Sequence, residues 1–254
     1  MNLSQFSLEK KVALITGATT GIGQALSIAL ASAGADICGV ASSGYFNETK
    51  NQVEKWGKHF HGITANLLRK ESVNYVIEET CSHFGKIDIL INNAGICRRA
   101  PIFEFSYDDW YEVMELNINI IFFLSQGVTK VFEKQETGGK IINICSLLSF
   151  QGGLYVPSYT ASKSALLGLT RSMANELASK GINVNAIIPG YIVTRANKKL
   201  RDDAVRNRGI SERIPAGRWG QPEDLGGMAI FLASSASDYC HGGAYPVDGG
   251  WLAR

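Results

Sequence analysis

Long apolar runs, paired cysteines and blocks of like charge are all missing from this sequence of 254 residues. No run of about 18 apolar residues is present, so no segment is expected to span a bilayer. The 25 basic and 23 acidic residues leave a formal charge of +2 and are scattered, which argues against nucleic-acid and membrane-surface partners. The N-terminus also lacks the apolar core of a signal peptide.

Cysteine and histidine are too dispersed to predict a disulfide framework or a metal site. The five cysteines include no C-x-x-C pair, and their odd number favours free thiols in a reducing compartment. The four histidines have no cluster of carboxylates beside them, so no metal is predicted. We therefore expect a cytoplasmic protein without a bound metal.

The composition is that of a globular chain. Hydrophobic residues make up 45% and charged residues 19%, which excludes a disordered tail and a coiled coil. No linker, repeat or low-complexity stretch divides the chain, and one α/β domain can have this length. We therefore predict a single domain over residues 1–254.

Short apolar runs alternate with helical patterns along the whole chain. This alternation predicts an α/β fold with a doubly wound, parallel, seven-stranded sheet and helices on both faces. Strands are expected at 11–16, 36–41, 60–64, 88–91, 140–145, 183–188 and 244–247, and helices at 21–33, 71–84, 110–132, 159–179 and 222–233. Residues 193–215 are highly charged without a clear apolar face, so we expect a mobile lid over the substrate there.

A glycine-rich turn follows the first predicted strand. Gly17, Gly21 and Gly23 lie in the stretch TGATTGIG, where glycine allows a sharp turn and a close approach of backbone to a pyrophosphate. The next helix would present its free N–H groups to the phosphates. A tight strand-to-helix turn alone would also explain the glycines, but the position favours a dinucleotide site.

The end of the second predicted strand is where a dinucleotide's ribose should lie. It reads Ala41-Ser42-Ser43, with neither the acid typical of NAD sites nor a cation for the 2′-phosphate of NADP. The choice between NAD and NADP stays open. The missing cation favours NAD slightly.

Tyr159 and Lys163 are four residues apart in a predicted helix, so their side chains share one face. A nearby ammonium lowers the pKa of a tyrosine and allows it to exchange a proton with an alcohol or alkoxide. A surface Tyr/Lys pair is the alternative. Ser146 favours the catalytic interpretation, because it follows the fifth predicted strand and would reach the crevice at the carboxyl ends of the strands.

Several polar residues near this crevice are further candidates. Asn117 lies in an apolar run and is either a buried structural amide or a link that holds a water near Lys163. Arg98 and Arg99 follow the fourth predicted strand and could hold a carboxylate by charge-assisted hydrogen bonds, unless they belong to a solvated loop. Trp251 is expected to anchor a subunit interface.

In these features the sequence resembles the short-chain dehydrogenase/reductase family. The matching elements cover nearly the whole chain in order: TGATTGIG, NNAG at 92–95, Asn117, Ser146, the Tyr159/Lys163 pair, and Pro189-Gly190 with Thr194. The stretches 141–153, 213–225 and 247–254 are similar to sugar-acid dehydrogenases of that family. The resemblance implies a Rossmann fold, a homotetramer, and a sugar-acid alcohol or ketone as substrate.

The resemblance also implies roles for individual residues. The catalytic tetrad would be Asn117, Ser146, Tyr159 and Lys163, and Ser146 and Tyr159 would contact the substrate. Arg98 and Arg99 are added as substrate contacts from their position and charge alone. Asn66 and Leu67 would contact the adenine, Asn93 the nicotinamide-side ribose, and Ile192 and Thr194 the carboxamide and pyrophosphate region. The full expected set of NAD(P) contacts is Gly17, Thr19, Thr20, Gly21, Ile22, Gly23, Ala41, Ser42, Ser43, Asn66, Leu67, Asn93, Ala94, Gly95, Tyr159, Lys163, Pro189, Gly190, Ile192 and Thr194.

Two classes of function remain compatible with this pattern. The first is an NAD(P)-dependent oxidoreductase that acts on a sugar acid, with another carbonyl reductase of the family as the alternative within enzymes. The second is a non-catalytic dinucleotide-binding regulator, since a fold does not fix a function. The presence of Ser146, Tyr159 and Lys163 favours the enzyme, because a regulator would be free to lose them.

Overall fold

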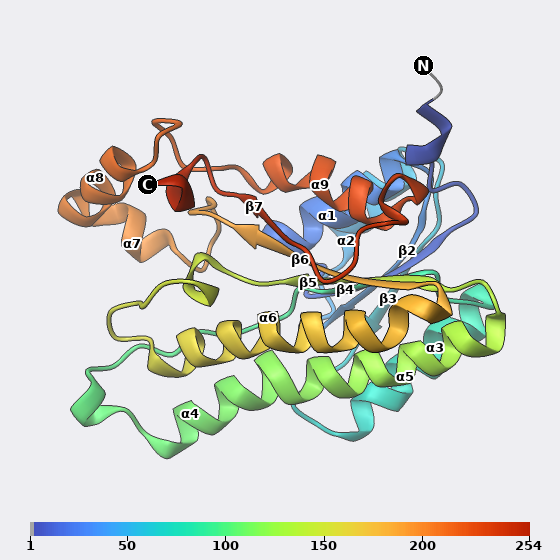
Figure 1. The fold of residues 1–254 in the computed structure, drawn as a ribbon, viewed down its shortest axis with the longest axis horizontal. Helices are drawn as coiled ribbons and strands as arrows, with labels where there is room; N and C mark the ends of the chain where they lie inside the picture. Colours follow the sequence, from blue (N-terminus) through green and yellow to red (C-terminus); the bar gives the residue numbers. More distant parts are fainter. Residues whose placement is uncertain (1–2) are drawn as a thin grey trace.

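The computed structural model describes residues 3–254 and contains one parallel sheet wrapped by helices (Figure 1). The strand order is β3-β2-β1-β4-β5-β6-β7, and every pair of neighbours is parallel. The strands are β1 (Val12–Thr16), β2 (Asp36–Ala41), β3 (Phe60–Thr64), β4 (Ile89–Asn92), β5 (Gly139–Ile144), β6 (Ile182–Pro189) and β7 (Ala244–Val247). The predicted doubly wound, seven-stranded sheet is confirmed.

The helices cover both faces of the sheet (Figure 1). They are α1 (Gly21–Ser32), α2 (Asn47–Glu54), α3 (Glu71–Phe84), α4 (Tyr107–Met114), α5 (Ile120–Gln135), α6 (Pro157–Leu177), α7 (Lys198–Asp202), α8 (Ala204–Arg213) and α9 (Gly226–Ala233). Ala13 and Ile15 of β1 pack toward α1 and α9, whereas Leu14 between them packs toward α3, α5 and α6. Both faces of the strand are therefore buried, which explains its uninterrupted apolar sequence.

Three local features differ from the sequence-based expectation. The helix predicted at 110–132 begins at Tyr107, passes through a π-helical turn at Glu115–Asn119 and ends at Gln135. Helix α2 was not predicted, because it is polar and buries only Thr49 and Val53. The charged segment 193–215 contains α7 and α8, which the sequence also did not predict, because neither helix has a buried residue.

The strand order reverses at β1, because the chain leaves β1 toward β2 on one side and returns through β4 on the other. Ligands of open α/β sheets bind at the carboxyl ends of the strands beside such a reversal. In the part of the chain that the structure describes, no helix combines the length and apolar character needed to cross a membrane.

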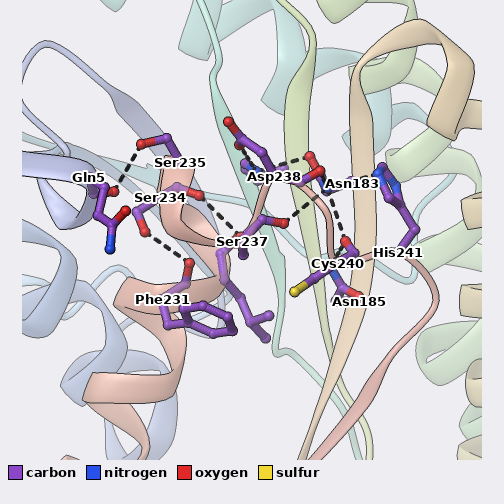
Figure 2. Close-up of polar contacts among 12 residues, drawn as sticks. Gln5, Asn183, Asn185, Phe231, Ser234, Ser235, Ser237, Asp238, Cys240 and His241 are labelled. Atoms are coloured by element: carbon purple, nitrogen blue, oxygen red, sulfur yellow. Dashed lines mark hydrogen bonds and ion pairs between the residues drawn. The ribbon is translucent and has the colours of Figure 1, made fainter.

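The amino edge of the sheet is held by polar contacts between β6 and the segment that precedes β7 (Figure 2). The side-chain nitrogen of Asn183 donates to the carbonyl oxygens of Ser237, Asp238 and Cys240 at 2.9–3.2 Å. Asn185 donates to the Cys240 carbonyl at 2.7 Å. These contacts satisfy loop carbonyls that would otherwise face the interior. They fix β7 on β6, and β7 leads to the C-terminal turn beside the site.

Candidate active site

The first strand-to-helix turn has the shape of a phosphate cradle. Gly17 and Gly21 have φ values of +70° and +57°, a region that side chains disfavour. A Cβ on Gly23 would lie 2.2 Å from the Gly17 carbonyl oxygen, so a side chain does not fit there. Helix α1 begins at Gly21 with no side-chain cap from Thr20. Its first N–H groups are therefore available to an anion at the helix start.

The turn after β4 is tied directly to this cradle. The side-chain nitrogen of Asn93 donates to the carbonyl oxygen of Thr16 at 2.8 Å and to that of Gly17 at 3.3 Å. The hydroxyl of Thr16 accepts hydrogen bonds from the backbone N–H groups of Asn93 and Ala94. The side-chain nitrogen of Asn93 is thus hydrogen-bonded within the protein, and the two turns form one rigid wall.

Asn117 lies behind the site, fully buried in the π-helical turn. Its oxygen accepts from the N–H of Ile96 at 3.0 Å, and its nitrogen donates to the Ile96 carbonyl at 2.9 Å and to the Ser162 hydroxyl at 3.1 Å. Ser162 in turn donates to the Tyr159 carbonyl oxygen at 2.8 Å. The amide therefore links the loop after β4 to the backbone of Tyr159, through direct contacts.

Ser146, Tyr159 and Lys163 meet where β5 ends and α6 begins. Pro157 starts α6, at a position that needs no N–H donor, and this places Tyr159 in the first turn. The Lys163 ammonium donates to the Ile144 carbonyl oxygen at 2.7 Å and lies 5.7 Å from the centre of the Tyr159 ring. The Lys163 residue is only 4% exposed.

Burial controls the ionisation of both groups. Desolvation raises the pKa of Tyr159 to about 12, against the lowering effects of a hydrogen bond with Ser146 and of the Arg99 charge. Desolvation also lowers the pKa of Lys163. At neutral pH the Tyr159 phenol therefore holds its proton, which is the form that can donate to a ketone oxygen.

A cavity of about 1120 Å³ runs along the carboxyl edge of the sheet. Every residue expected to contact the coenzyme lines it, as do Ser146, Arg98 and Arg99. Asn117 is absent from its lining, which agrees with its position behind the turn. Among residues 3–254, no group of three or more His, Cys, Asp or Glu side chains could hold a metal ion.

The two candidate arginines differ in their partners. The guanidinium of Arg98 forms ion pairs with Glu112 at 2.6 Å and with Asp109 at 3.4 Å, so its charge is already used within the protein. Arg99 is exposed in the cavity wall and lowers the pKa of Tyr159. Arg99 therefore lies near the reacting group, whereas Arg98 holds its loop against α4.

Some cavity residues could not be found from the sequence. Gln151, Arg195, Arg206 and Arg213 line the cavity, although no local motif marks them. Trp251, which the sequence suggests as an interface anchor, lines the same cavity and is 5% exposed within this chain. The fold alone brings the C-terminal turn to the site.

Known proteins provide an independent comparison. A family model described as enoyl-(acyl carrier protein) reductase matches residues 17–252. The chain is 54% identical over 257 residues to 2-dehydro-3-deoxy-D-gluconate 5-dehydrogenase of Dickeya dadantii, with all of both chains covered. It is 51% identical over 249 residues to the Bacillus subtilis protein of the same name, covering 98% of this chain and 97% of that one.

A solved relative has the same fold. The crystal structure of a gluconate 5-dehydrogenase from Burkholderia cenocepacia, in complex with NADP and tartrate, superimposes with a TM-score of 0.93. The two chains are 39% identical, and 99% of each is covered.

The close contact at Gly23 yields a stability prediction. Gly23→Ala should lower the free energy of unfolding by about 1–3 kcal/mol, because the new methyl group meets backbone atoms that cannot move away. Gly227→Ala is the matched control, since no atom beyond its chain neighbours and the adjacent backbone of α9 lies within 4 Å of its Cβ position. There alanine should leave stability unchanged or improve it. Urea denaturation measures both, and equal losses would contradict the proposed packing of the turn.

Proposed function

The chain belongs to the short-chain dehydrogenase/reductase family, and on that premise we propose that it is the 2-dehydro-3-deoxy-D-gluconate 5-dehydrogenase (2-deoxy-D-gluconate 3-dehydrogenase) of uronate catabolism. It is an oxidoreductase that interconverts a secondary alcohol and a ketone on a sugar acid. The observation that supports the reaction best is the group of Ser146, Tyr159 and the buried Lys163 beside the glycine cradle. Full-length relatives at 51–54% identity support the assignment of the substrate.

The cavity suits a nicotinamide dinucleotide. Gly23 leaves space that a Cβ would fill, and the uncapped start of α1 offers N–H groups to a pyrophosphate. The wall of Asn93, Ala94 and Gly95 would flank the nicotinamide-side ribose, and Lys163 would reach its hydroxyls. When bound, the coenzyme supplies the hydride donor or acceptor.

The protein's own groups manage the proton. In ketone reduction, the Tyr159 hydroxyl donates its proton to the carbonyl oxygen as the carbon accepts hydride. Ser146 donates a hydrogen bond to the same oxygen and orients it. In alcohol oxidation the phenolate must accept the hydroxyl proton, so this direction needs the pKa of Tyr159 to fall. The hydrogen bond from Ser146 and the charge of Arg99 favour that ionisation.

The coenzyme preference depends on the end of β2. Ala41, Ser42 and Ser43 line the cavity there and provide no charge of either sign. The sequence favours NAD for lack of a cation, whereas the solved Burkholderia relative binds NADP. Serine hydroxyls can bond either a ribose hydroxyl or a phosphate. We therefore propose that the protein accepts both coenzymes.

We also propose a cytoplasmic homotetramer. Large aromatic side chains are exposed on the outer side of the α4–α5 helical run, and a second copy could cover them: Tyr107, Tyr111, Phe122 and Phe123. The free cysteines suit a reducing compartment. Residues 193–215, with α7 and α8, would act as a mobile lid over the substrate end of the cavity.

A substrate panel tests the proposed function. Purified protein should oxidise 2-dehydro-3-deoxy-D-gluconate with kcat/KM at least tenfold above that for D-gluconate, assayed with NAD and NADP in parallel. A preference for D-gluconate would assign a gluconate 5-dehydrogenase instead. No turnover of any sugar acid with either coenzyme would reject the enzyme assignment.

Tyr159→Phe tests the proton donor. The change removes only the ionisable oxygen, so kcat should fall at least about 100-fold while the Kd of coenzyme stays near that of the wild type. Steady-state kinetics and a coenzyme fluorescence titration measure the two quantities. Retention of more than about a tenth of kcat would contradict the role of Tyr159.

Ala41→Asp tests the ribose position. The new carboxylate should repel a 2′-phosphate and raise the KM for NADP, while the KM for NAD changes little. Ala41→Asn is the matched uncharged control and should affect the two coenzymes equally. If Ala41→Asp instead raises the KM for NAD and the KM for NADP equally, the ribose does not bind at the end of β2.

A further inference from the structure

The C-terminal turn and the end of α8 both contribute residues to the lining of the cavity. Figure 1 shows these two segments close together, away from α6. Gly249 and Gly250 have φ values of +64° and +88°. A Cβ on Gly249 would lie 2.8 Å from Ile214, and one on Gly250 would lie 3.0 Å from Pro215. The Ala216 N–H also donates to the Gly249 carbonyl oxygen at 2.9 Å. The turn is thereby fixed against the residues that directly follow α8.

Trp251 connects this wall to the loop that follows β5. Its indole N–H donates to the side-chain oxygen of Gln151 at 2.9 Å, on the loop that follows β5. The ring of Tyr191 lies 4.7 Å from the Trp251 ring. The guanidinium carbon of Arg213 lies 4.0 Å from the centre of the same indole ring. The indole therefore provides a rigid surface on which the guanidinium is stacked.

Arg213 offers an uncommitted charge in the cavity wall. No ion pair within residues 3–254 includes it, whereas Arg98 is paired with Glu112 and Arg208 with Glu212. A stacked guanidinium keeps its planar set of donors free at the edge, which matches the two oxygens of a carboxylate. Because stacking already restricts the Arg213 side chain, the side chain loses less conformational entropy when it binds an anion.

We propose that Arg213, stacked on Trp251, binds the carboxylate of the sugar-acid substrate and sets the preference for acids over neutral sugars. This proposal rests on the proposed function, and it moves the carboxylate away from the Arg98–Arg99 pair expected from the sequence. Gln151 orients the indole and borders the same space.

The position of the reacting carbon favours Arg213 over Arg99. A 5-dehydrogenase of a gluconate derivative reacts at C5, and the carboxylate is C1, four carbon–carbon bonds away. The cation that binds the acid should therefore lie at a distance from Tyr159. Arg99 precedes Ala100, whose N–H donates to the Tyr155 carbonyl oxygen at 3.1 Å just before α6, so Arg99 lies near the reacting end. Arg213 lies on the wall formed by α8 and the C-terminal turn.

The test compares an acid with its uncharged amide. Wild type, Arg213→Met and Arg213→Lys are assayed on 2-dehydro-3-deoxy-D-gluconate and on its primary amide. Arg213→Met should raise the KM for the acid about tenfold or more, the factor expected for one charge-assisted hydrogen bond, while the KM for the amide changes less than about threefold. Arg213→Lys should recover part of the loss, because it keeps the charge but not the planar donor set.

Arg208→Met is the matched control. Arg208 is on α8 too, pairs with Glu212 at 2.7 Å and does not line the cavity, so its loss should leave the acid-to-amide preference unchanged. An unchanged preference in Arg213→Met overturns the proposal, and the same loss in Arg99→Met then places the carboxylate there. If the wild type turns over no sugar acid, the proposed function fails first, and this assignment fails with it.

Discussion

The candidate active site depends on the desolvation of Tyr159 and Lys163 at the carboxyl ends of the strands. Burial favours the neutral form of both groups, which raises the pKa of Tyr159 to about 12 and lowers that of Lys163. The surrounding contacts offset this cost: Ile144 accepts a hydrogen bond from Lys163, and Ser146 bonds Tyr159. The result is a protonated phenol in the cavity wall, held beside a buried lysine.

The fold supplies the precision that this pair requires. The Asn117 amide, in a π-helical turn, connects the loop after β4 to Ser162 and so to the backbone of Tyr159. Such turns inside α-helices are frequent at functional sites, because the extra residue re-aims a side chain. Thr16 and Asn93 similarly join the glycine cradle to the turn after β4. The coenzyme cavity and the proton-transferring group therefore share one rigid frame.

The strands and the glycine cradle could be predicted from the sequence, because short stretches of neighbouring residues determine them. The seven strands follow from apolar runs, and the cradle follows from glycines at positions where φ is positive or a Cβ would clash. Contacts between distant segments could not be predicted in this way. The Arg98 charge is neutralised by Glu112 on another element, and Trp251 meets Gln151 a hundred residues earlier in the chain. Polar helices such as α2, with only two buried residues, also lack a hydrophobic stripe to reveal them.

The pH dependence of alcohol oxidation in the wild type and in Arg99→Met tests the central claim most directly. Oxidation needs the phenolate, so kcat should rise with pH through the pKa of Tyr159 in the complex with substrate. Removing the Arg99 cation removes an effect that lowers this pKa, so the rising limb should move to higher pH in the variant. A limb at the same pH in both proteins, or a rate independent of pH, would contradict control of the reaction by the ionisation of Tyr159.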